Sequence, residues 1–139
     1  MGKVINTNAP DKRRKYEMRT IAEILRRLGQ KQGIDEESKD MVAAIVFCLR
    51  AIDETVEESV RAWEKLNYWK KADDFQEKWW WTSQMSKKLE ALVRQGQWEE
   101  LPPTLMKLFP YFSDIEVSKS MRSEEDWSGC YANLMQSGE

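Results

Sequence analysis

Residues 38–66 read SKDMVAAIVFCLRAIDETVEESVRAWEKL, and this stretch decides the fold. One set of apolar side chains recurs in it every seven residues: Val42, Leu49, Val56 and Trp63. A second set with a single polar member is interleaved with the first: Ile45, Ile52, Ser59 and Leu66. An apolar repeat with alternating spacings of three and four residues, kept over four heptads, is typical of a long helix that packs along partner helices.

The composition favours one folded domain made of helices. The chain has 139 residues, of which 41% are hydrophobic and 33% are charged. This length favours a single domain, and the balance is typical of a folded protein rather than a disordered one. Only six Gly and four Pro are present. Turns are therefore few, which favours long helices over a fold of many short strands.

Two further segments carry helical patterns. The first runs from about Asp11 to Leu28, with an apolar stripe made of Met18, Ile21, Leu25 and Leu28. The second begins at Asp74, which resembles a capping box together with Glu77, and it ends before Gly96. Shorter helical patterns follow Pro102-Pro103 and begin again at Ser123.

We therefore predict an all-α helical bundle built on two long antiparallel helices, at residues 38–70 and 74–95. A basic N-terminal helix packs across this pair, and short C-terminal helices close the remaining side. Residues 1–10 form a flexible N-terminal arm, and residues 11–139 form a single domain.

The residue types that most enzymes need are missing or scattered. The chain has no His, which excludes His-based acid-base catalysis, Ser-His and Cys-His pairs, and His metal ligands. Its two cysteines, Cys48 and Cys130, cannot form a zinc site by themselves. The six glycines are isolated, so there is no phosphate-binding loop. We predict a protein without catalytic residues, metal or cofactor.

Two groups of carboxylates are candidates for a metal site. Glu36, Glu37 and Asp40 are followed by Glu54 and Glu57. This pattern loosely resembles the EExxE…ExxD pattern of all-α nucleotide pyrophosphatases, which bind magnesium, and the resemblance implies a metal-dependent nucleotide hydrolase. Both groups fall on one predicted helix, about 27 Å apart, which is too far for a shared ion. We therefore expect helix-surface acids.

The charges divide the chain into a basic start and an acidic remainder. Residues 1–33 carry a net charge of +6, and residues 34–139 carry −8. Four cations gather on the polar side of the first helix over about 21 Å: Lys12, Lys15, Arg19 and Arg26. This stripe either meets the acidic part of the chain or follows the phosphates of a nucleic-acid backbone. Glu23 lies within the stripe and weakens the second interpretation.

Seven Trp in 139 residues is a large number. Because consecutive helical residues diverge by 100°, Trp79, Trp80 and Trp81 cannot share one apolar stripe, and Trp80 points outward. Trp69 also lies off its apolar stripe. Trp leads the residues that dominate binding interfaces. We therefore take Trp69, Trp80 and Trp98 as candidate partner-binding residues.

The sequence thus predicts a non-enzymatic helical interaction protein, an adaptor or a small subunit of a larger assembly. Its partner is another protein or a second copy of the chain. The alternative is a nucleic-acid backbone-binding small subunit of a nucleoprotein complex. We expect no membrane partner, because the longest apolar run has nine residues and a spanning helix needs about 20. A polar N-terminus and only two cysteines make the cytoplasm the expected location.

Overall fold

The structure is a computed structural model that describes residues 9–136. The described part of the chain is all-α, as predicted, and contains no strand. Its elements, including two short 3-10 helices, are α1 (Pro10–Gly29), α2 (Glu36–Lys65), α3 (Trp69–Arg94), η1 (Trp98–Glu100), α4 (Leu101–Met106), α5 (Phe109–Phe112), η2 (Glu124–Asp126) and α6 (Cys130–Gln136).

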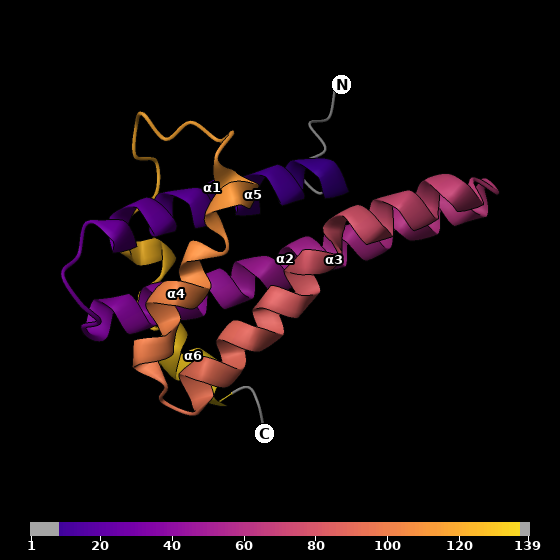
Figure 1. Cartoon of the computed structure of the whole chain (residues 1–139). Coiled ribbons are helices and arrows are strands. Elements are labelled where there is room, and N and C mark those ends of the chain that lie inside the picture. Colours follow the sequence, from indigo (N-terminus) through magenta and orange to yellow (C-terminus); the bar gives the residue numbers. More distant parts are fainter. Residues whose placement is uncertain (1–8, 137–139) are drawn as a thin grey trace.

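The bundle is organised around the antiparallel pair of α2 and α3 (Figure 1). Helix α1 packs along α2, and α6 contacts α2 as well. Near the turn that joins them, α2 and α3 project beyond the other helices as a two-helix hairpin (Figure 1). We call residues 59–76 the hairpin end. This confirms the predicted all-α bundle built on two long antiparallel helices, with the basic N-terminal helix packed along α2 rather than across the pair.

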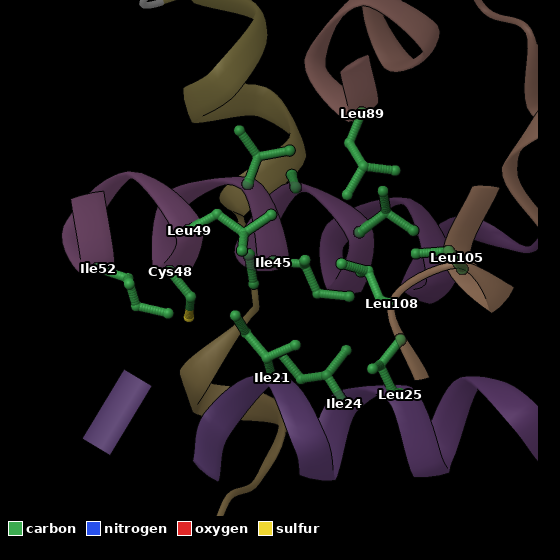
Figure 2. Close-up of a cluster of buried hydrophobic side chains, with 14 of the residues drawn as sticks. Ile21, Ile24, Leu25, Ile45, Cys48, Leu49, Ile52, Leu89, Leu105 and Leu108 are labelled. Atoms are coloured by element: carbon green, nitrogen blue, oxygen red, sulfur yellow. The ribbon is translucent and has the colours of Figure 1, made fainter. Parts of the chain in front are cut away.

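The core sits around the first half of α2. Residues 41–46 are all buried, as expected for a helical segment that is apolar almost all round. Ile45 and Leu49 of α2 lie among Ile21 and Ile24 of α1 and Leu89 of α3 (Figure 2). Leu105 and Leu108, from the short segment after η1, complete this cluster (Figure 2). The short C-terminal elements therefore close the side that α1 and α3 leave open.

The predicted break between the two long helices was wrong. The sequence pattern predicts helices over residues 38–70 and 74–95, whereas α2 ends at Lys65 and α3 begins at Trp69. Asn67 adopts a positive φ of 64°. The Asn67 N–H donates to the Glu64 carbonyl (2.9 Å), and the Tyr68 N–H donates to the Trp63 carbonyl (2.9 Å). These two bonds form a Schellman motif, in which Asn replaces the usual Gly.

Other helix ends agree more closely with the sequence. Asp35 caps α2, because its carboxylate accepts a hydrogen bond from the Ser38 N–H (2.8 Å). Gly96 ends α3 with a φ of 67°. The last predicted helix, from Ser123, is interrupted: η2 and α6 are separated by residues 127–129, where Gly129 has a φ of 83°. The predicted N-terminal arm lies outside the described residues except for Ala9 and Pro10, and Pro10 begins α1.

None of the helices in residues 9–136 is both long enough and apolar enough to cross a membrane.

Candidate interaction surfaces

The tip of the hairpin exposes three large apolar side chains next to one another. The exposed fractions are 60% for Leu66, 53% for Tyr68 and 57% for Trp69. Leu66 and Tyr68 lie in the turn between the two helices, and Trp69 is the first residue of α3. Basic side chains surround them in the sequence, at Lys65 and at Lys70-Lys71, with no acid within residues 65–71. The apolar tip is therefore flanked by basic side chains, of which Lys70 is ion-paired with Asp74 (3.3 Å).

At the hairpin end, the space between α2 and α3 is filled by side chains other than those of the exposed tip. Trp63 and Phe75 meet edge to face, with ring centroids 4.8 Å apart. Ala72 is fully enclosed between the two helices, with 1% exposure. Lys71 lies with its ammonium 5.5 Å from the centroid of the Trp63 ring. The exposed tip side chains are thus not needed to fill the space between α2 and α3.

Trp80 is also exposed, at 52%, and borders a groove between α2 and α3 of about 520 Å³. Val56 and Val60 are buried residues of this groove. Its charged lining is mixed, with three acids and two bases: Asp53, Glu57, Glu64, Arg61 and Lys87. The outward direction predicted for Trp80 is therefore present in the structure. No described element covers the ring.

The two neighbours of Trp80 face inward, as the 100° spacing requires. The Trp79 ring lies 5.5 Å from the Arg14 guanidinium, which is buried and donates to the Thr55 hydroxyl (3.2 Å). Trp81 stacks on Tyr111 with centroids 3.9 Å apart. Trp79 and Trp81 thus join α3 to α1 and α5.

The third candidate, Trp98, is half-buried within the chain itself. Its ring centroid lies 5.9 Å from that of Tyr131, and the Lys39 ammonium lies 4.8 Å from it. These contacts join η1 to α2 and α6. The structure therefore does not bring Trp98 together with Trp69 and Trp80, which lie on the hairpin.

The basic stripe of α1 is not continuous in the structure. Lys12, Lys15 and Arg26 are exposed, whereas Arg19 is half-buried. The Arg19 side chain donates to the Glu23 carboxylate (2.8 Å) and to the Lys119 carbonyl (2.6 Å). The loop of residues 117–123 thus lies on α1 at Arg19 and separates Arg26 from the two lysines.

Glu23 holds this loop in place. Its side chain is 1% exposed, and its oxygens accept hydrogen bonds from the backbone N–H groups of Met121 (2.9 Å) and Arg122 (2.8 Å). Burial alone would raise the pKa of Glu23, but the hydrogen bonds from Arg19 and from the two amides outweigh it and lower the pKa. Glu23, which weakens the interpretation of the stripe as a phosphate-binding surface, is therefore a buried residue that holds the loop on α1.

Two of the carboxylates considered as metal ligands, Glu37 and Asp40, form hydrogen bonds that hold the C-terminal elements on α2. Glu37 accepts a hydrogen bond from the Trp127 indole N–H (3.1 Å), and Asp40 accepts one from the Tyr131 N–H (2.9 Å). Glu54 and Glu57 lie further along the same unbroken helix α2. Within residues 9–136, no group of three or more Asp, Glu, His or Cys side chains could hold a metal ion.

Burial raises the pKa of both cysteine thiols. Cys48 is buried, and its burial, followed by the nearby Glu17 carboxylate, raises the pKa of the thiol well above its usual value. Burial and the charge of Asp40 raise the pKa of the Cys130 thiol. A reactive cysteine needs a lowered pKa.

Leu66 is assigned to the apolar contact face by its heptad position but is exposed in the structure, because α2 ends at Lys65 and not at residue 70. The signal was present: Asn67 is the residue type that, after Gly, most readily adopts a positive φ. The role of Glu23 in holding the loop left no local signal, because Met121 and Arg122 lie about a hundred residues further along the chain.

Comparison with known proteins finds no matching family model, no matching curated protein and no matching solved structure.

Proposed function

We propose that this chain is a non-enzymatic helical interaction protein, an adaptor or a small subunit of a larger assembly, that binds a protein partner through the hairpin tip. The observation that carries the proposal is the exposure of Leu66, Tyr68 and Trp69 where α2 ends and α3 begins, at the end of a hairpin that projects beyond the other helices (Figure 1). We further propose that it works in the cytoplasm, where the thiols of Cys48 and Cys130 stay reduced.

The exposed tip contributes little to folding. Burial of apolar surface stabilises a fold by about 25 cal/mol per Å² removed from water, and these side chains remain largely in water. Contiguous exposed apolar patches on monomeric proteins mark interaction sites. Tyr and Trp are the residue types that dominate binding energies at such sites.

The hairpin end also offers a rigid base for the tip. The Schellman turn fixes the backbone between the helices, and the Trp63–Phe75 pair joins them directly below it. A pre-organised surface loses less conformational entropy on binding. Lys65 and Lys71 flank the apolar residues and form no ion pair within residues 9–136, which favours a partner with an apolar pocket and an acidic rim.

A photo-reactive amino acid at position 69 tests this proposal in the native cells of the protein. We expect one cross-linked adduct of defined mass on illumination, because position 69 lies in the interface. The matched control carries the same amino acid at Met121, which is 66% exposed but lies far from the hairpin along the chain. Tyr68→Ser, combined with the probe at 69, should reduce the adduct.

Two results would contradict the proposal: the absence of any adduct at position 69, or the same adduct from both positions. The mass of the adduct separates a second copy of the chain from a different protein. The molecular mass of the purified protein at low and high salt provides an independent reading, since an apolar contact should persist at high salt.

A further inference from the structure

A polar pocket of about 300 Å³ lies between α1 and the loop of residues 117–123. Along α1, the pocket begins after Arg19, the residue that donates to the Lys119 carbonyl of the loop. Seven residues line it, most of them hydrogen-bond donors: Glu23, Arg26, Arg27, Gln30, Val117, Ser118 and Ser120. We call it the Arg26 pocket.

Arg27 is held in a fixed position at this pocket. Its guanidinium lies 5.2 Å from the centroid of the Trp127 ring, which is 1% exposed. The same group donates to the Ser120 hydroxyl (3.1 Å) and to the Arg122 carbonyl (3.3 Å). These contacts fix a positive charge beside the pocket without neutralising it, because none of the three partners is an anion.

Arg26 supplies a second positive charge that the chain does not compensate. Its side chain is exposed, and it forms no ion pair with any residue from 9 to 136. In contrast, α1 pairs Arg13 with Glu58 (2.6 Å) and Arg19 with Glu23 (2.8 Å). An unpaired arginine beside a fixed one leaves the pocket with an unmatched positive charge.

The one acid of the pocket does not oppose an anion strongly. Glu23 is ion-paired with Arg19, and its oxygens accept bonds from the Met121 and Arg122 amides and from the Ser120 hydroxyl. Arg19, Glu23, Arg26 and Arg27 together carry a net charge of +2. The pocket therefore combines a positive field with hydroxyl and amide donors.

We propose that the Arg26 pocket binds the phosphate group of a nucleotide, either free or within a single strand. Arginine binds phosphate through two parallel N–H···O bonds, and these charge-assisted bonds are stronger than neutral ones. Ser118 and Gln30 supply further donors to a tetrahedral oxyanion. A volume of about 300 Å³ is at the lower end for ligand pockets and suits one nucleotide unit.

This proposal is narrower than a phosphate-binding stripe along all of α1. The loop of residues 117–123 separates Arg26 from Lys12 and Lys15, so the two lysines are not part of the site. It is also independent of the hairpin tip, which is formed by different residues of α2 and α3.

The test is calorimetric titration of the full chain with three probes: inorganic phosphate, adenosine 5′-monophosphate and a ten-residue oligothymidylate. We expect at least one probe to bind and Arg26→Gln to weaken that binding about tenfold or more. The matched control is Lys12→Gln, a substitution of another exposed cation on α1, which should change the affinity less than twofold. Circular dichroism verifies that both variants are folded.

The three probes distinguish the sources of the phosphate. Equal affinity for all three indicates that the pocket recognises the phosphate alone. Tighter binding of the oligonucleotide, with a salt dependence that falls by about one counterion in Arg26→Gln, indicates a strand. The proposal is overturned if none of the probes binds at millimolar concentration, or if Lys12→Gln weakens binding as much as Arg26→Gln.

Discussion

The two halves of α2 carry the same apolar heptads but have different surroundings. In the first half, Ile45 and Leu49 are completely buried, because α1, α3 and the C-terminal elements all cover them. In the second half, Val56 is still buried, but Trp63 near the end of the helix is only half-buried and Leu66, which follows its last residue, is 60% exposed, because α3 is the main helix beside them. The heptad pattern specifies a helix and one contact face. It does not specify how many partners that face receives.

The largest expected effect is a core truncation in the first half. Leu49→Ala should lower the free energy of unfolding by about 2–5 kcal/mol, because it leaves a cavity among α1, α2 and α3. Leu66→Ala, the same change at the tip, should alter it by less than about 0.5 kcal/mol. Urea unfolding of both variants measures the difference, and equal losses would show that the hairpin tip is covered in solution.

The next largest effect concerns the loop that lies on α1. Glu23→Gln removes the charge that accepts bonds from Arg19 and from the amides of Met121 and Arg122. It should cost about 1–3 kcal/mol of unfolding free energy, the range expected when buried hydrogen-bond partners are left unmatched. The control is Glu116→Gln, an exposed acid near the same loop.

Hydrogen exchange locates the effect of Glu23→Gln. The Met121 and Arg122 amides should exchange faster in the variant. The exchange rates of the amides in the first half of α2 should rise only as much as the global loss of stability requires. Unchanged exchange at these two amides would mean that Glu23 does not hold the loop.

Leu49 and Glu23 also differ in how far their roles can be predicted from the sequence. The heptads, the apolar stripe of Ile21 and Leu25, and the stop at Gly96 depend on neighbours within a few residues, and they correctly predicted helices and core. Glu23 interacts with residues about a hundred positions away, so its role was not readable from α1 alone. Helical spacing alone predicts a continuous stripe of Lys12, Lys15, Arg19 and Arg26. It carries no information about the distant loop of residues 117–123, which packs onto α1 at Arg19.

A third prediction uses the pH dependence of the α2 cap. The Asp35 pKa falls from 3.8 to about 2, first because the Ser38 N–H donates to the carboxylate and then through the Ser38 hydroxyl and Lys31. A pKa that is lower in the folded state means that the carboxylate stabilises the fold above pH 3.8, and that this contribution is lost as the pH falls toward 2.

Asp35→Asn should flatten this part of the pH dependence. Asn caps helices about as well as Asp but does not titrate, so the capping bond to Ser38 remains at every pH. Urea midpoints of the wild type and the variant, compared from pH 5 down to pH 2, should be similar at pH 5 and separate toward pH 2, where only the wild type loses this contribution. The same slope in both proteins would show that other carboxylates, such as Glu23 and Glu37, account for the acid sensitivity.

The smallest expected effect concerns the turn of the hairpin and sharpens the comparison between the halves of α2. Asn67 has a φ of 64°, which costs most L-residues about 1–2 kcal/mol and costs glycine nothing. Asn67→Gly should therefore leave the unfolding free energy within about 1 kcal/mol of the wild type, while Asn67→Val should lower it by about 1–2 kcal/mol. Because few elements cover the hairpin end, the strain of Asn67→Val should appear first as faster amide exchange within residues 59–76. If the amides around Ile45 respond equally, the two halves of α2 unfold as one cooperative unit, and the hairpin end is stabilised by the core despite its exposure.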